Sequence, residues 1–305
     1  MRLPADESQS QTVNGYRSRI TGGWLVGYFL TAFGITWGLA VVAAGHLLPF
    51  TVPGVVISIA AILLHYGPAL AAVLLVGLNG GRKSLAELAR SLGHWRTGGF
   101  WWVFLFAFPV LVRLAAVGLD VALGGTFPTL MSAAGVPDGN PFLLIPVVFV
   151  LVFFQAGLAE EAGWRGYALP GLQNRWGAVT SSVVLSLFWC VWHFHPMNFP
   201  ILRPIAPWYV LNIIPFTILL TWIYNNTGKS LLMAALFHTV SNVSDWIIPT
   251  SPVGHSLEVG VRPLILQGVL TWAAALTVIV LYGSRTLVRT SHQSPDLHSL
   301  RSSPE

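Results

Sequence analysis

Long apolar runs alternate with short polar and basic segments along this chain of 305 residues. A helix that crosses a bilayer needs about 20 consecutive, mostly apolar residues. The pattern predicts eight spans, at residues 24–48, 54–78, 99–123, 142–165, 178–196, 207–225, 230–248 and 263–284. The fifth and seventh of these are less apolar than the others, because they carry histidine, asparagine and aspartate.

Composition agrees with this pattern. Hydrophobic residues make up 54% of the chain and charged residues only 9%, and the mean hydropathy is +0.68. These values differ from those of a soluble domain and favour an all-α polytopic membrane protein. The formal net charge is +5, but the basic residues are scattered, which argues against nucleic acid as a partner. A single cysteine excludes an internal disulfide.

The loops predict the orientation of the chain. With eight spans, 13 Lys and Arg residues lie on one side of the membrane and 2 on the other. The positive-inside rule therefore places both termini in the cytoplasm. We expect a cytoplasmic tail at 1–23, with no signal peptide, a membrane domain at 24–284, and a cytoplasmic tail at 285–305 that is disordered. Residues 82–92 have an amphipathic, basic pattern typical of a helix at the membrane interface.

Two adjacent acids, Glu160 and Glu161, stand at the end of the fourth apolar run and are followed by Arg165. One aspartate at the centre of a membrane helix costs roughly 2.5–3.5 kcal/mol, so such groups indicate a functional site. Glu161 and Arg165 are four residues apart and share a helix face. Glu160 is turned by about 100° from that face. We expect Arg165 to neutralise Glu161 while Glu160 projects elsewhere.

Two further polar groups fall within the apolar spans. His193 and His195 end the fifth span, and on a helix they point in different directions, so only one should face Glu160. His238 and Asn242 share one face of the seventh span. Asp245 lies on roughly the same face, about two turns from His238.

Each of these residues alone is most simply a partner in a hydrogen bond between helices. Together they supply carboxylates, imidazoles and an amide to one interior. Those are the groups needed to activate a water molecule and to stabilise an oxyanion. The pattern therefore favours a buried polar cavity that serves as an active site.

The three motifs also carry a family resemblance. Glu-Glu-x-x-x-Arg, then a histidine after tryptophan near a proline, then His-x-x-x-Asn resembles the CPBP family of CAAX proteases and bacteriocin-processing enzymes, over residues 141–248. This family includes the type II CAAX prenyl endopeptidase. Its second motif usually has phenylalanine four residues before the histidine, where this chain has Trp189. Trp192 before His193 matches the family and favours His193 over His195.

The resemblance implies an intramembrane endopeptidase of a membrane peptide or lipidated protein, such as a prenylated CaaX substrate, in a bacterial plasma membrane. Glu160 would be the general base with His193, His238 and Asn242 would bind the oxyanion, and Glu161 and Arg165 would support them. Proteins of this family are commonly called metalloproteases, and a metal-free mechanism that depends on glutamate has also been proposed for them. Glu160, His193 and His238 are thus candidate zinc ligands by type. The chain has no His-Glu-x-x-His motif, so both mechanisms stay open.

Two rival functions remain. A member of the same fold without proteolytic activity would serve in bacteriocin immunity or as a scaffold. A small transporter would use the carboxylate as a proton relay, but transporters usually show internal repeats. For the polar groups to meet, we expect the fourth helix to continue past Arg165 to about Leu169 and to break at Pro170 and Gly171. A short surface helix would then end near Trp176. A separation above about 12 Å between Glu160 and both His193 and His238 would reject the catalytic interpretation.

Overall fold

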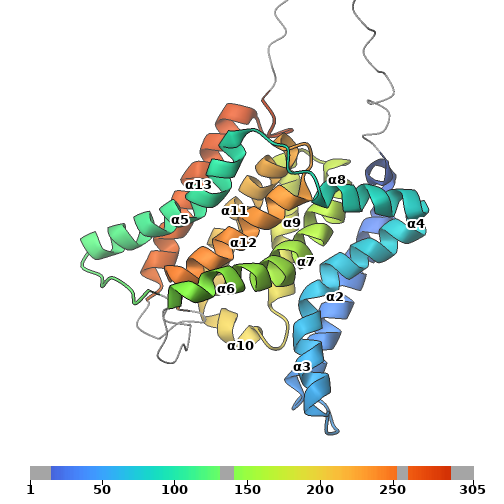
Figure 1. The fold of residues 1–305 in the computed structure, drawn as a ribbon, viewed down its shortest axis with the longest axis horizontal. Coiled ribbons are helices and arrows are strands. Elements are labelled where there is room, and N and C mark those ends of the chain that lie inside the picture. The colour runs from blue at the N-terminus through green and yellow to red at the C-terminus, as the bar shows by residue number, and fades with distance from the viewer. Residues whose placement is uncertain (1–14, 131–140, 253–259, 290–305) are drawn as a thin grey trace, which may run out of the picture.

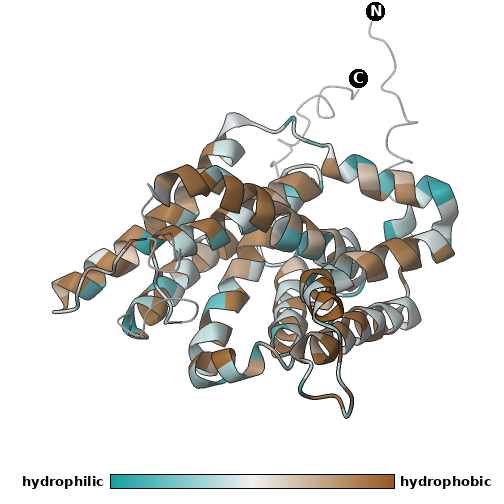
Figure 2. Ribbon diagram, turned by 60° about the horizontal axis from the view of Figure 1, so that its bottom comes forward, coloured by the Kyte–Doolittle hydropathy of each residue, from teal (hydrophilic) through white to brown (hydrophobic). Residues whose placement is uncertain are grey.

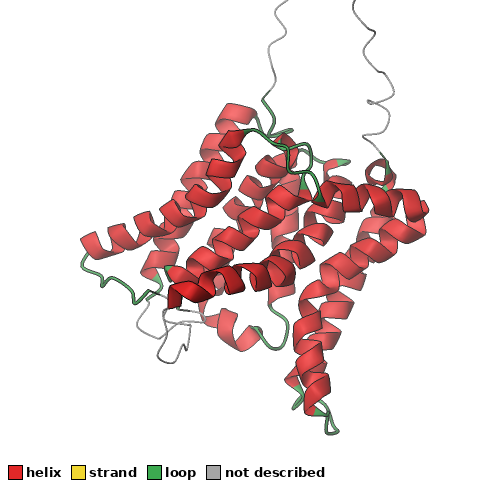
Figure 3. Ribbon diagram, in the orientation of Figure 1, coloured by secondary structure: helices red, strands yellow, loops and turns green. Residues whose placement is uncertain are grey.

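The structure is a computed structural model that describes residues 15–130, 141–252 and 260–289. These three ranges form helices joined by short loops and contain no β-strand (Figures 1 and 3). The predicted all-α fold is therefore confirmed. Most of the N-terminal tail and residues 290–305 of the C-terminal tail lie outside the described residues.

The α-helices are α2 (Gly22–Ala44), α3 (Gly54–Leu63), α4 (Gly67–Leu92), α5 (Gly99–Ala122), α6 (Ile145–Val152), α7 (Ala159–Gly163), α8 (Leu169–Gln173), α9 (Ala178–His193), α10 (Phe199–Leu202), α11 (Ala206–Asn226), α12 (Leu231–Ile247) and α13 (Arg262–Tyr282). Short 3₁₀ turns are η2 (Tyr16–Arg19), η3 (Leu64–Tyr66), η5 (Pro141–Leu144) and η8 (Arg203–Ile205). Two π-helical turns are η6 (Phe153–Leu158) and η7 (Trp164–Ala168).

The described residues contain six helical segments that are long and apolar enough to cross a membrane. They are Gly22–Ala44, Gly54–Leu92, Gly99–Ala122, Phe142–Gln173, Phe199–Asn226 and Arg262–Tyr282. Helix α9 is apolar but has 16 residues, and α12 has 17 and carries the polar third motif. Apolar side chains cover the outer helix faces, as for Leu143 (75% exposed) and Val280 (82% exposed), and hydrophobic residues predominate along the helices in Figure 2. This is the surface of a polytopic membrane protein.

Helix α4 changes direction at Gly81, whose φ of 61° and ψ of −159° are not helical. Glycine tolerates a positive φ because it lacks a Cβ atom. The residues that follow, 82–92, form a helix that turns back toward the middle of the molecule at the right of Figure 1. A helix was predicted over these residues, and its one-sided burial, with Ser84 and Leu88 inside, fits the amphipathic pattern.

The fourth helix runs without interruption from Phe142 to Gln173. Its predicted continuation past Arg165 is confirmed, but the predicted break at Pro170 is wrong, and residues 174–177 are a turn and a short loop rather than a surface helix. In a regular α-helix the amide of residue 170 would bond to the carbonyl of Gly166. Proline has no N–H, and the Tyr16 hydroxyl donates to the Gly166 carbonyl at 2.7 Å instead.

Two glycines let this helix pack closely on its neighbours. A Cβ atom at Gly157 would lie 2.6 Å from the carbonyl oxygen of Ala235 on α12. One at Gly163 would lie 2.5 Å from the backbone of Pro68 on α4. Both distances are too short for a real Cβ, so only glycine permits this approach. The segment that carries the two acids is thereby held between α4 and α12.

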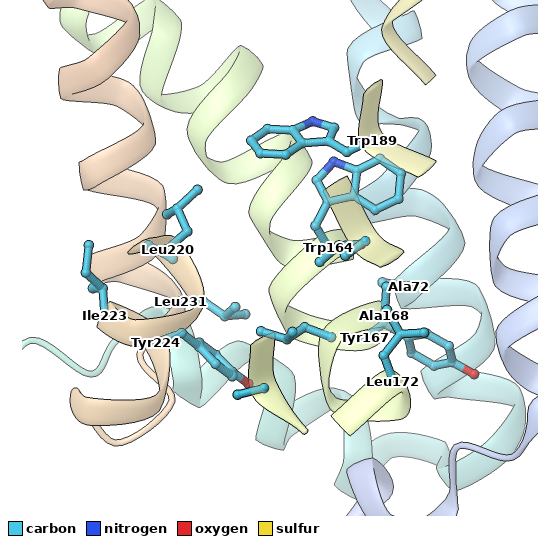
Figure 4. Close-up of a cluster of buried hydrophobic side chains, with 14 of the residues drawn as sticks. Ala72, Trp164, Tyr167, Ala168, Leu172, Trp189, Leu220, Ile223, Tyr224 and Leu231 are labelled. Carbon is cyan, nitrogen blue, oxygen red and sulfur yellow. The ribbon is translucent and has the colours of Figure 1, made fainter. Parts of the chain in front are cut away.

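A large apolar cluster packs around this segment. Figure 4 shows Ala72 of α4 facing Tyr167 and Leu172 of the long helix, with Tyr224 of α11 in the same cluster. Packing of this kind, together with hydrogen bonds between helices, holds membrane helices together.

The two ends of the described chain lie on the same face of the molecule. The Asn174 side chain donates to the carbonyl of Arg17 at 2.7 Å, and the amide of Ala178 donates to the carbonyl of Arg285 at 2.7 Å. Residues 174–178, between α8 and α9, therefore contact both ends of the described chain.

Replacing Tyr16 by phenylalanine tests the bond that supports Pro170. Burial raises the pKa of the Tyr16 hydroxyl above its usual value, so the group stays protonated and donates. We expect Tyr16→Phe to lower the free energy of unfolding by about 1–3 kcal/mol, because a buried carbonyl loses its donor. Thermal unfolding in detergent measures this.

Tyr282→Phe is the matched control, because the Tyr282 ring packs on Trp222 and its hydroxyl has no hydrogen bond to the described residues. Its effect should stay within about 0.5 kcal/mol. Equal effects of the two substitutions would refute the role of Tyr16.

Candidate active site

A buried ion pair lies at the centre of the molecule. Arg165 donates to Glu161 Oε1 at 2.9 Å, and both side chains are 0% exposed. The predicted pairing of these two residues is confirmed. His238 Nδ1 lies 2.9 Å from the same Glu161 oxygen, so α12 joins the pair.

Glu160 projects away from this pair, as its position on the helix predicts. Its Oε2 atom accepts the indole N–H of Trp189 at 2.6 Å and lies 4.0 Å from His193 Nε2. Both partners come from α9, the helix that follows in sequence. The two adjacent acids therefore have separate environments, Glu161 facing Arg165 and His238 and Glu160 facing α9.

Hydrogen bonds fix the proton positions on both imidazoles. The Trp189 carbonyl can only accept, so His193 Nδ1, at 2.8 Å, carries the hydrogen. Glu161 is paired with Arg165 and likewise accepts from His238 Nδ1. In each neutral ring the other nitrogen, Nε2, is then an acceptor. A neutral His238 consequently cannot donate to an oxyanion through Nε2 unless the ring also binds a second proton.

Both histidines line a pocket of about 160 Å³ between α5, α9, α11, α12 and α13. Trp189 and Asn242 line it as well. The Asn242 amide has no hydrogen-bond partner among the described residues and is exposed. Glu160 is 3% exposed and does not line the pocket. It contacts two residues that do line the pocket, Trp189 through the hydrogen bond and His193 at 4.0 Å.

The two residues whose roles the sequence left open lie outside this group. His195 follows the end of α9 and packs against Trp192, with ring centroids 6.4 Å apart. Asp245 forms an ion pair with Arg113 of α5. The structure therefore places His193, and not His195, beside Glu160.

Sequence reasoning missed Trp189. Its indole N–H binds Glu160, its ring lies 4.7 Å from the Arg165 guanidinium carbon, and it contacts the His238 ring at 5.2 Å. The signal was present in the chain, because the tryptophan replaces the phenylalanine usual at this place and only the tryptophan carries a donor.

The candidate zinc ligands are suitable in type but not in arrangement. His193 and His238 each present Nε2, and each ring is held through Nδ1, as is usual for histidines that bind metals. However, the described residues contain no group of three His, Cys, Asp or Glu side chains placed to hold a metal ion. The Glu160 oxygen nearest His193 is already bonded to Trp189. The described side chains are therefore not arranged as a zinc site.

The fold and the site together define a polytopic helical membrane protein with a buried carboxylate–imidazole cluster. Residues 142–244 match the family model described as type II CAAX prenyl endopeptidase Rce1-like. The chain is also 29% identical, over 171 residues, to CAAX prenyl protease 2 of Methanococcus maripaludis. That match covers 53% of this chain and 61% of the relative, so the chain spans about three fifths of the relative's length. The matches confirm the resemblance drawn from the three motifs, and with the apolar helices they identify an integral membrane protein.

Substituting Glu161 tests the buried ion pair. Glu161→Gln keeps the shape of the side chain but leaves the Arg165 charge without its partner. Loss of one member of a buried pair costs about 3–5 kcal/mol, and thermal or denaturant unfolding in detergent should show a loss of that size.

The control is Asp120→Asn, which removes the partner of Arg262, a residue whose side chain is 47% exposed. Water can solvate that arginine, so the loss should be about 1 kcal/mol or less. A smaller loss for Glu161→Gln than for the control would contradict the account.

Proposed function

We propose that this protein is an intramembrane endopeptidase that hydrolyses a peptide bond with a water molecule activated by Glu160. The observation that carries the proposal is the 4.0 Å separation between Glu160 Oε2 and His193 Nε2. Two acceptors that share one water lie about 4–4.5 Å apart when each hydrogen bond is about 2.8 Å long. The spacing suits one water held between the two residues.

In this proposal Glu160 removes a proton from the water as it attacks the peptide carbonyl. The neutral His193 accepts the second hydrogen through Nε2 and fixes the direction of attack. A positioned general base contributes about 10²–10⁴-fold to a rate. Glu160 then gives this proton to the amide nitrogen as the C–N bond breaks, which releases a carboxylic acid and an amine.

The developing oxyanion needs a donor on the opposite side of the carbonyl. The amide of Asn242 lines the pocket, has free N–H groups within the described part of the chain, and suits this role. His238 lies one turn before it on α12 and would donate through Nε2 when doubly protonated. Glu161 holds the His238 ring, and Arg165 holds Glu161.

Trp189 is a positioning residue in this mechanism. Its N–H fixes Glu160 Oε2, and its side chain also lines the pocket. A base with one oxygen anchored in this way has fewer orientations to lose in the transition state.

The names of the matching family and relative point to the substrate. Both names contain the words CAAX prenyl, which describe a lipid-modified C-terminal motif, and the pocket lies among apolar helices. We therefore propose a membrane peptide or lipidated protein as substrate. The face that holds both ends of the described chain would lie in the cytoplasm, because the loops rich in Lys and Arg are predicted on that side.

Replacing Glu160 tests the base directly. Glu160→Gln keeps an oxygen for the Trp189 N–H but cannot take a proton. We expect cleavage of a prenylated peptide by the purified protein in detergent to fall at least about 100-fold, as measured by mass spectrometry of the products. Running the same assay with a chelator separates a metal contribution from the glutamate mechanism.

Glu87→Gln, a change in a carboxylate outside the site that accepts from the Tyr16 amide, serves as the control and should keep activity within about twofold. Equal cleavage by wild type and Glu160→Gln would reject the assigned base. A wild-type protein that cleaves no peptide would favour an immunity or scaffold role.

Trp189→Phe restores the aromatic residue usual in the family and removes only the N–H donor and part of the ring. We expect kcat to fall about tenfold with little change in KM, because the base loses its orientation while the pocket keeps an aromatic wall. Steady-state kinetics with the same peptide measures the two constants. An increase in KM alone would assign Trp189 to substrate binding instead.

A further inference from the structure

The pocket beside the histidines has a second polar end. Arg113 of α5 lines it there and is 6% exposed. Apart from the histidines, Arg113 is the charged residue among the described residues that line the pocket. The other walls carry the apolar side chains of Phe108, Pro109, Val112, Ile213, Phe216 and Phe237, and the polar side chains of Tyr209, Asn212 and Thr271.

Neighbouring side chains hold the Arg113 guanidinium in place. Its Nε donates to Ser244, and its Nη1 donates to Asp245, Thr250 and Gln267. Its Nη2 has one acceptor, the Ser241 carbonyl at 3.3 Å. Nη2 carries two hydrogens, so one N–H has no acceptor among the described residues.

Gln267 of α13 adds a second donor at this end. Its Oε1 accepts from Arg113 Nη1 at 2.9 Å and from the Thr250 hydroxyl. Because Arg113 can only donate, the oxygen and nitrogen of the Gln267 amide are fixed. The Nε2 group then has no acceptor among the residues that the structure describes, although Gln267 lines the pocket.

Two kinds of N–H donor therefore converge where no carboxylate lines the wall. Both side chains line the pocket, so these N–H groups can reach a ligand that offers an acceptor at this place. An arginine and an amide suit a carboxylate, which offers two oxygens to such donors. Asp245 already balances the arginine charge, so attraction here comes mainly from the hydrogen bonds.

We propose that this end of the pocket binds the free C-terminal carboxylate of the peptide substrate through Arg113 Nη2 and Gln267 Nε2. The proposal rests on the proposed endopeptidase function and names the group by which its substrate is recognised. A substrate blocked at this end, or continuing past it, would bind less well.

The length of the pocket fits a short product. Along α12, Ser241 lies about 4.5 Å and Asp245 about 10 Å beyond His238, at 1.5 Å per residue. An extended peptide spans about 3.3–3.6 Å per residue. A carboxylate at Arg113 therefore places the bond at His238 two or three residues before the C-terminus, with apolar side chains against the aromatic and aliphatic walls.

Binding and cleavage of two peptides test this proposal. Both carry a farnesylated cysteine followed by three apolar residues. One ends in a free carboxylate and the other in an amide. Dissociation constants are measured on Glu160→Gln so that the peptide is not consumed, and kcat/KM is measured on the otherwise unchanged protein. We expect the acid to exceed the amide at least about tenfold in both measurements, as hydrogen bonds to a charged group predict.

Two substitutions locate the effect. Gln267→Glu keeps an acceptor for Arg113 but places a negative charge beside the peptide carboxylate. It should abolish the preference for the acid, so that acid and amide bind equally. Arg113→Lys keeps the ion pair with Asp245 but loses the second donor, and it should reduce the preference too. Arg262→Gln, at the other arginine–aspartate pair of α5, should leave the preference unchanged.

Equal binding of acid and amide would overturn the proposal, even if both peptides are cleaved. An acid preference that survives Gln267→Glu would also overturn it. Tight, Gln267-dependent binding of the acid without cleavage would support the carboxylate site and contradict the proposed hydrolysis, so the two failures are distinguishable.

Discussion

The buried ion pair of Glu161 and Arg165 sets the arrangement of the surrounding helices. Neither side chain is exposed, and isolated charges at membrane depth are costly. Arg165 Nε and Nη2 have no hydrogen-bond acceptor within the described ranges, and the face of Trp189 covers the guanidinium instead. His238 completes the shell of Glu161. The contacts that Trp189 and His238 make with this ion pair therefore hold α9 and α12 against the long helix.

The backbone of the long helix makes this contact possible. π-helical turns lie on both sides of the two acids, and such turns are frequent at functional sites because they change which side chains share a face. Gly157 permits the approach to α12, and Gly163 the approach to α4. Glu160 takes no part in this pair. It accepts a hydrogen bond from Trp189 of α9 and lies near His193 of the same helix.

Hydrophobic periodicity was enough to predict an all-helical membrane protein, and i,i+4 spacing predicted the Glu161–Arg165 pair. Both are properties of neighbours in sequence. The continuous helix through Pro170 was not predictable, since it depends on a hydroxyl from Tyr16, far away in the chain. The same holds for the site. Spacing separated Glu160 from Glu161, but only the packing of α9 shows that Trp189 binds Glu160 and also lines the pocket.

The ion pairs of α5 were not predictable from the sequence either. Arg113 and Asp120 lie seven residues apart on α5, and each pairs with a different helix: Arg113 with Asp245 of α12 and Asp120 with Arg262 of α13. Helix α5 is consequently fastened to both α12 and α13, and one wall of the pocket is fixed by ion pairs. Charges on one helix could not reveal partners that come from two others.

The central claim is that Glu160 activates a water and does not itself attack the peptide. Turnover in ¹⁸O-labelled water, followed by mass spectrometry of the product and of the segment containing Glu160, tests it most directly. The account predicts the label in the new carboxylate of the product and none in Glu160. Label in Glu160 would show a covalent intermediate and contradict the account.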